Sequence, residues 1–172
     1  IKAAILLNTE PAFDAAAGAK GLEQADMVIT LSPFKANLDI SDVLLPVAPF
    51  TETSGTFVNA EGRVQSFHAV VKPLGETRPA WKVLRVLANL LELPGFDYES
   101  SQDVLTAAIG AETKEVPSAL RSNITKVAAK VPENEAAEPV TASIYQLDGI
   151  VRRATSLQLT ADARLAREGG AA

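Results

Sequence analysis

Residues 3–7 read AAILL, and residues 27–31 read MVITL. Each run is continuous and apolar, and a proline-containing turn follows each within a few residues. Short unbroken apolar runs of this kind are typical of strands that are buried on both faces of a parallel sheet. We therefore expect residues 3–7 to form a central parallel strand, with residues 27–31 as its parallel neighbour.

The connection between these two runs predicts a helix. Residues from Phe13 to Gln24 are rich in alanine, although Gly18 and Gly21 lower the helix propensity. Strand, helix and strand in this order favour a right-handed crossover and an α/β domain of Rossmann-like type. A third apolar run, Val43 to Val47, contains Pro46 and predicts a short strand that turns outward.

The clearest helix is predicted from Ala80 to Leu93, before Pro94-Gly95. Its polar side chains share one narrow stripe: Lys82, Arg85, Asn89 and Glu92. Apolar residues, including Trp81, cover the remaining surface, so we expect most of this helix to be buried.

Composition excludes several classes of function. The 172 residues contain no cysteine and one histidine, His68, which excludes thiolate ligands and leaves no multi-histidine metal site. We therefore expect no catalytic residue and no metal ligand in this stretch. A net charge of −5 argues against nucleic-acid partners. No apolar run approaches the roughly 18 residues that span a bilayer, so we expect no direct membrane insertion.

The chain changes in character near residue 110. We expect an α/β domain over residues 1–110, a proline-containing linker or surface segment over 111–142, and an extended or helical docking tail over 143–172. The basic pair Arg152-Arg153 in the tail is expected to be solvated, with a partner or phosphate contact as the alternative.

Residues 50–66 are the best candidate for a functional loop, with a possible hairpin around Asn59 to Arg63. The loop follows a predicted parallel strand, where open α/β sheets bind ligands. Its candidate residues are Glu52, Gly55, Thr56, Asn59, Glu61, Gly62 and Arg63. Two interpretations remain open: these groups bind a ligand, or they satisfy one another and the loop backbone. If Arg63 pairs with Glu52 or Glu61 in a buried site, its removal should cost about 3 kcal/mol.

The same loop carries a resemblance. Residues 41–65, SDVLLPVAPFTETSGTFVNAEGRVQ, resemble the A-D-V-V-L-P…E…G-T-F-x-N-x-E-G-R-x-Q signature of the molybdopterin oxidoreductase superfamily, and residues 75–81, GETRPAW, resemble the G-E-A-R-P-D-W that follows it. Downstream, YQLDGIVRRA (145–154) and SLQLTADA (156–163) resemble the large iron–sulfur subunit of bacterial NADH:quinone oxidoreductase, respiratory complex I.

This resemblance implies a fragment from the C-terminal part of such a subunit, with a formate dehydrogenase-like α/β fold. The parent subunit would carry 4Fe-4S and 2Fe-2S clusters on cysteines that lie outside this stretch, and the fragment itself would hold no cofactor. Its implied role is scaffolding and contact with other peripheral-arm subunits and with the N-terminal part of the same chain. The implied location is cytoplasmic, peripheral on the inner membrane through the complex.

Two alternatives stay open. In the first, the chain is a segment of an active molybdenum or tungsten bis-pterin oxidoreductase such as a formate dehydrogenase, and the loop from Glu52 to Arg63 supports the cofactor. Where the family has a threonine-rich segment, this chain has residues 35–42, KANLDISD, which argues against an intact pterin site. In the second, it is a free-standing Rossmann-like ligand-binding module.

Overall fold

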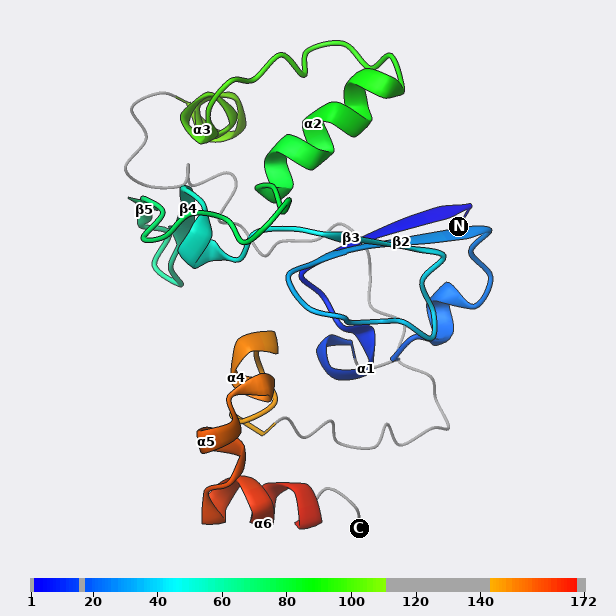
Figure 1. Ribbon diagram of the computed structural model, residues 1–172, viewed down its shortest axis with the longest axis vertical. Helices are drawn as coiled ribbons and strands as arrows, with labels where there is room; N and C mark the ends of the chain where they lie inside the picture. The colour runs from blue at the N-terminus through cyan, green and yellow to red at the C-terminus, as the bar shows by residue number, and fades with distance from the viewer. Residues whose placement is uncertain (1, 16–17, 111–142, 170–172) are drawn as a thin grey trace, which may run out of the picture. The chain divides into compact units, whose positions relative to one another are not determined.

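The computed structural model describes residues 2–15, 18–110 and 143–169 (Figure 1). Backbone contacts divide the chain into two units. The first comprises residues 1–45 and 132–172, and the second comprises residues 46–131. The predicted boundaries at residues 110 and 142, and the predicted linker between them, fall on or within a stretch outside the described residues, so they stay predictions.

The first unit contains a three-stranded sheet of order β1-β2-β3, formed by Ala3–Leu7, Met27–Ser32 and Val43–Pro46. β1 and β2 are parallel, and their register runs from Ala3 opposite Met27 to Leu7 opposite Leu31. The predicted parallel pair is therefore confirmed, as is the short strand at residue 43. The mixed α/β class also holds.

The central strand of this sheet is β2, so the prediction of residues 3–7 as the central strand is wrong. Val28, Thr30 and Leu31 in β2 are buried, whereas Ile5 and Leu7 in β1 are 47% and 39% exposed. The reason is that β1 has one strand neighbour within the described sheet and β2 has two. An apolar run alone does not distinguish an edge strand from a central strand.

The connection from β1 to β2 is not the single helix predicted from Phe13 to Gln24. It contains a four-residue helix, α1 (Pro11–Asp14), and a 3-10 turn, η1 (Lys20–Leu22). The backbone becomes extended at Ala15, and Gly18 adopts a φ of +57°, in the left-handed region that interrupts a helix. Local glycine content therefore outweighed the alanine-rich composition.

Side chains on the segment before β3 tie it to β2. The Asp42 carboxylate accepts a hydrogen bond from the Val28 N–H at 2.7 Å. The hydroxyl oxygens of Thr30 and Ser41 lie 2.7 Å apart, and the Asn37 amide also donates to Thr30 Oγ1. These bonds satisfy the fully buried Thr30 hydroxyl, as burial requires.

The C-terminal part of the first unit consists of three short helices, α4 (Gly149–Arg153), α5 (Thr155–Gln158) and α6 (Ala161–Gly169). Asp148 caps α4 by accepting from the N–H groups of Ile150 and Val151. Gln158 is buried, and its amide donates to the carbonyls of Tyr145 and Val151. This side chain therefore fastens α5 to the preceding turn and to α4.

The second unit contains η2 (Phe50–Glu52), an antiparallel hairpin of β4 (Gly55–Val58) and β5 (Val64–Phe67), and two helices, α2 (Ala80–Leu90) and α3 (Ser101–Ile109). The hairpin confirms the one suggested around residues 59–63. Ser100 and Asp103 form a reciprocal capping box at the start of α3.

Helix α2 differs from its prediction in two respects. It ends at Leu90 rather than Leu93, because Glu92 adopts a φ of +57° and breaks the helical geometry. Its single buried residue is Ala88, whereas Leu90 is 76% exposed. The prediction of a mostly buried helix is therefore wrong. Apolar periodicity indicates which face of a helix can be buried, but it does not show that another element packs against that face.

No helix in the described ranges combines the length and the apolar character that crossing a membrane demands.

Candidate functional site

The turn of the β4–β5 hairpin is built around Asn59. The Asn59 side-chain oxygen accepts hydrogen bonds from the backbone N–H groups of Glu61 at 3.1 Å and Arg63 at 2.8 Å. Gly62 adopts a φ of +85°, which favours glycine at this position. Three candidates, Asn59, Glu61 and Gly62, thus serve the turn through local geometry.

Glu52 and Thr56, two further polar candidates of this loop, also have partners inside the second unit. The Glu52 carboxylate accepts from the Leu74 N–H at 2.9 Å, and the hydroxyl oxygens of Thr56 and Ser66 lie 3.0 Å apart across the hairpin. These contacts favour the interpretation in which the polar groups of the loop satisfy one another and the nearby backbone.

Gly55 begins β4 against an aromatic cluster formed by Phe50, Phe57 and Phe67. The Phe57 and Phe67 rings are stacked with centroids 4.8 Å apart, and Phe50 meets both edge-on. A Cβ atom at Gly55 would lie 2.8 Å from the Phe67 ring. Close packing against the Phe67 ring therefore favours glycine here, and its φ lies outside the left-handed region.

We expect Gly55→Ala to lower the free energy of unfolding by about 1 kcal/mol, because the methyl group displaces the Phe67 ring from its stack. Hydrogen exchange of the hairpin amides in the full-length parent chain would measure this. Gly21→Ala is the matched control, since nothing lies within 4 Å of its added Cβ. Equal exchange in the two variants would contradict the packing argument.

Arg63 does not form the buried ion pair that its spacing from Glu52 and Glu61 suggested. Its side chain is exposed, and among the described residues it pairs with neither of these carboxylates. The ion pair inferred from spacing is therefore wrong. Residues that are close in sequence within a hairpin turn can point their side chains in different directions.

Arg63→Ala should accordingly change the free energy of unfolding by less than about 0.5 kcal/mol, as is usual for exposed side chains. A denaturant titration of the full-length chain, monitored at the hairpin, would check it. If the free energy of unfolding fell by about 3 kcal/mol, the cost of breaking a buried ion pair, Arg63 would have a buried carboxylate partner after all.

The resemblance implies a pterin cofactor in active relatives, so the fit of this loop to such a group can be tested. A cradle for a polar heterocycle would present buried donors or acceptors without protein partners. In the part of the chain that the structure describes, the buried side-chain atoms without a partner are Trp81 Nε1, Arg85 Nε and Arg152 Nε, and none belongs to the loop. Among the described loop residues, no unpaired buried polar atom points to such a cradle.

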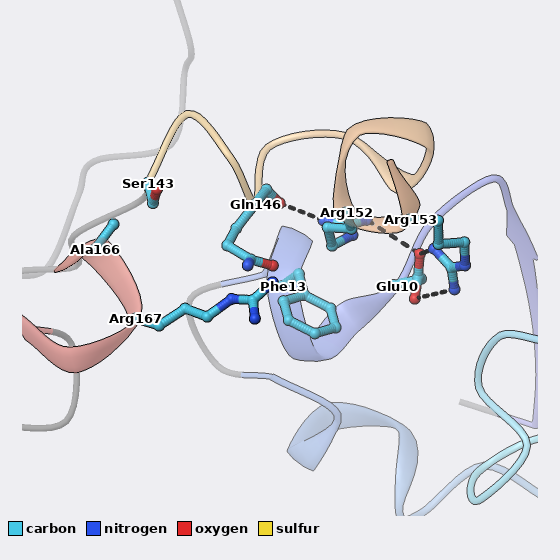
Figure 2. A pocket seen from close by; sticks show the side chains of 8 residues that line it. All are labelled: Glu10, Phe13, Ser143, Gln146, Arg152, Arg153, Ala166 and Arg167. Carbon is cyan, nitrogen blue, oxygen red and sulfur yellow. Dashed lines mark hydrogen bonds and ion pairs between the residues drawn. The ribbon is translucent and has the colours of Figure 1, made fainter. Parts of the chain in front are cut away.

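A cluster of charged groups lies in the first unit, where α1 meets α4 (Figure 2). Arg152 donates to the Glu10 carboxylate at 3.2 Å, to Asp14 at 3.0 Å and to the Gln146 carbonyl. Arg153 makes a two-pronged contact with Glu10, at 2.7 and 2.9 Å. We call these four charged residues, Glu10, Asp14, Arg152 and Arg153, the clasp.

Aromatic rings flank both arginines of the clasp. The Arg152 guanidinium lies 4.7 Å from the centroid of the Phe13 ring, and that of Arg153 lies 4.4 Å from the Phe34 ring. The Arg152 side chain is only 6% exposed. The solvated state expected for this pair is therefore wrong for Arg152. Arg153 stays exposed but is also paired, and the carboxylates that hold both cations lie about 140 residues earlier in the chain.

The clasp shifts the proton affinity of its members. Hydrogen bonding from Arg153, opposed by burial, lowers the pKa of Glu10. Burial raises the pKa of Asp14, but the hydrogen bonds from Arg152 and from the Glu10 N–H outweigh it, so the net pKa is lowered. The Glu10 carboxylate in turn raises the pKa of Arg153.

A carboxylate whose pKa is depressed by folding contributes stability above its unfolded pKa and loses it as the pH falls through the folded value. In the unfolded chain, the side-chain pKa values of Glu and Asp are about 4. We therefore expect the amides of α4 to be fully protected at neutral pH and to lose protection below about pH 4. Glu10→Gln should remove most of this pH dependence, and an unchanged profile in that variant would contradict the assignment.

Sequence reasoning missed the clasp because no short motif contains it. One signal was available: Glu10 and Asp14 are spaced by four residues, as are acids that share one face of a helix. It could have marked α1 as the partner of a basic pair.

Comparison with known proteins bears on the first half of the chain. The family model described as molybdopterin oxidoreductase matches residues 1–90, just over half of the sequence. A "Putative formate dehydrogenase" of Staphylococcus aureus strain RF122 is 39% identical over 77 residues, and the "Probable oxidoreductase YjgC" of Bacillus subtilis is 40% identical over 70.

These alignments cover 44% and 41% of this chain but only 8% and 7% of the relatives. The chain thus corresponds to a small part of much longer proteins. Together, the loop signature, the mixed α/β fold with its parallel strands, and the matched residues 1–90 identify this chain as a member of the molybdopterin oxidoreductase family.

Proposed function

We propose that this chain is a non-catalytic scaffold and subunit-contact segment of the large iron–sulfur subunit of a bacterial NADH:quinone oxidoreductase. In that role it supports electron transfer from NADH to quinone without carrying a redox centre. The absence of cysteine from the sequence is consistent with clusters held elsewhere in the parent chain.

The observation that carries this proposal is the clasp. Residues 152 and 153 lie in the segment that resembles the complex I subunit, and both are occupied in holding α4 to α1. Charged groups that pair with one another serve architecture, because most of their donors and acceptors are already engaged. The loop from Glu52 to Arg63 gives the same indication in part, since the Glu52 and Asn59 side chains bond to nearby backbone.

By this proposal the partners are other peripheral-arm subunits and the N-terminal part of the same polypeptide. The location that follows is the cytoplasmic face of the inner membrane, reached through the complex. The exposed apolar residues of α2, Val86 and Leu90, are consistent with contacts to such neighbours.

A second function is favoured by the names of the relatives. One relative bears the name "Putative formate dehydrogenase", and another the name "Probable oxidoreductase YjgC". The chain would then be a segment of an active molybdenum or tungsten bis-pterin enzyme, with Glu61 and Arg63 available at the exposed hairpin turn.

Metal and pterin analysis of the full-length native chain separates the two. Iron together with NADH:quinone oxidoreductase activity of the purified assembly, without molybdenum, tungsten or pterin, is the expected result. Stoichiometric molybdenum or tungsten with pterin, and formate oxidation, would overturn the scaffold proposal and establish the second function.

A further inference from the structure

Beside the clasp lies a pocket of about 510 Å³, whose described lining residues all belong to the first unit. It is lined by Glu10, Phe13, Ser143, Gln146, Arg152, Arg153, Ala166 and Arg167. Its volume falls in the range of sites for small molecules, roughly 300 to 1,000 Å³. The pocket is therefore large enough for an organic ligand and not just for a bare ion.

Among the described residues, the charges around this pocket do not balance. Arg152 and Arg153 are matched by Glu10 and Asp14, two cations against two anions. Arg167 is a third cation, and its partner among the described residues is the neutral Gln158 side-chain oxygen. One guanidinium at the pocket is thus left without a carboxylate within the part of the chain that the structure describes.

Figure 2 shows where this guanidinium lies. Arg167 extends from α6 toward Gln146 and Phe13, across the pocket from the clasp. The Phe13 residue is 55% exposed, although Arg152 lies against its ring. The pocket therefore presents the Arg167 guanidinium and the exposed part of the Phe13 ring on the same side of the clasp.

We propose that this pocket binds a small organic monoanion, with its acidic group on Arg167 and a flat apolar body against Phe13. The guanidinium fork suits an oxyanion, which it can bind with two parallel hydrogen bonds. The Phe13 ring and the Ala166 methyl group supply the apolar contact. Binding of this kind is independent of the scaffold function.

Ligand-observed fluorine NMR on the full-length chain tests this, with 4-fluorobenzoate as the probe and 4-fluorobenzyl alcohol as its uncharged counterpart. We expect the carboxylate to bind and the alcohol not to. Arg167→Gln should raise the dissociation constant about tenfold, the effect of losing a hydrogen bond to a charged group. Arg164→Gln is the matched control, because Arg164 is exposed on the same helix and does not line the pocket.

Two further variants guard against a trivial loss of structure. Arg167→Lys retains the charge and should recover part of the affinity, and Phe13→Leu should weaken binding several-fold while leaving the charge untouched. The proposal is overturned if the probe does not bind the native chain, if the alcohol binds as well, or if Arg164→Gln weakens binding as much as Arg167→Gln.

Discussion

Replacing Arg152 with methionine should weaken the attachment of α4 and α5 to α1. The substitution leaves Glu10 and Asp14, 13% and 25% exposed, without one of their cations, and it removes the hydrogen bond to the Gln146 carbonyl. Truncating one partner of a buried, hydrogen-bonded ion pair costs about 3 kcal/mol or more. We expect the local opening free energy of α4 and α5 to fall by this amount.

Hydrogen exchange of the full-length chain measures this directly. A loss of about 3 kcal/mol corresponds to roughly 100-fold faster exchange of the amides from Ile150 to Gln158, at about 1.36 kcal/mol per tenfold. Arg164→Met makes the same chemical change on α6, at an exposed site with no acidic partner among the described residues. Equal exchange in the two variants would show that the clasp contributes little.

The second large effect is expected at the centre of the sheet. Leu31 is 1% exposed in β2, the strand that lies between β1 and β3. Leu31→Ala should cost about 3 kcal/mol, the sum of lost burial and the cavity that remains. Exchange of the β1 and β2 amides in the full-length chain would report the loss.

Leu38→Ala is the control for this experiment. It removes the same atoms from a side chain that is 64% exposed, in the segment between β2 and β3. We expect a change of less than about 0.5 kcal/mol there. If Leu31→Ala were equally mild, the core of the first unit would have to lie elsewhere.

These effects bear on what the sequence alone could predict. The parallel pair of strands, the short strand at Val43 and the hairpin near Asn59 were predictable because each depends on signals within a few residues: apolar runs, proline and an Asn-x-x-Gly turn. The loop signature also placed the chain in its family, as the match over residues 1–90 confirms.

The failures share a physical origin. The helix expected after Phe13 was disrupted at Ala15 and Gly18, where local geometry overrode composition. The burial expected on α2 was not found. A periodic apolar pattern predicts which face of a helix would be buried, but not whether another element packs against that face. The Arg63 ion pair failed because proximity in sequence does not set the direction of side chains in a turn.

By itself, the sequence determined the parallel pair of strands, the short third strand, the hairpin and the family, since these follow from short-range patterning and from a motif. Only the tertiary structure decided that β2 is central, that Arg152 and Arg153 are held by Glu10 and Asp14, and that Arg167 lines the same pocket with the neutral Gln158 as its partner. The members of the clasp are separated by as many as 143 residues. Contacts between residues so far apart in sequence depend on the tertiary fold, and no local sequence pattern shows which carboxylate will pair with a given arginine.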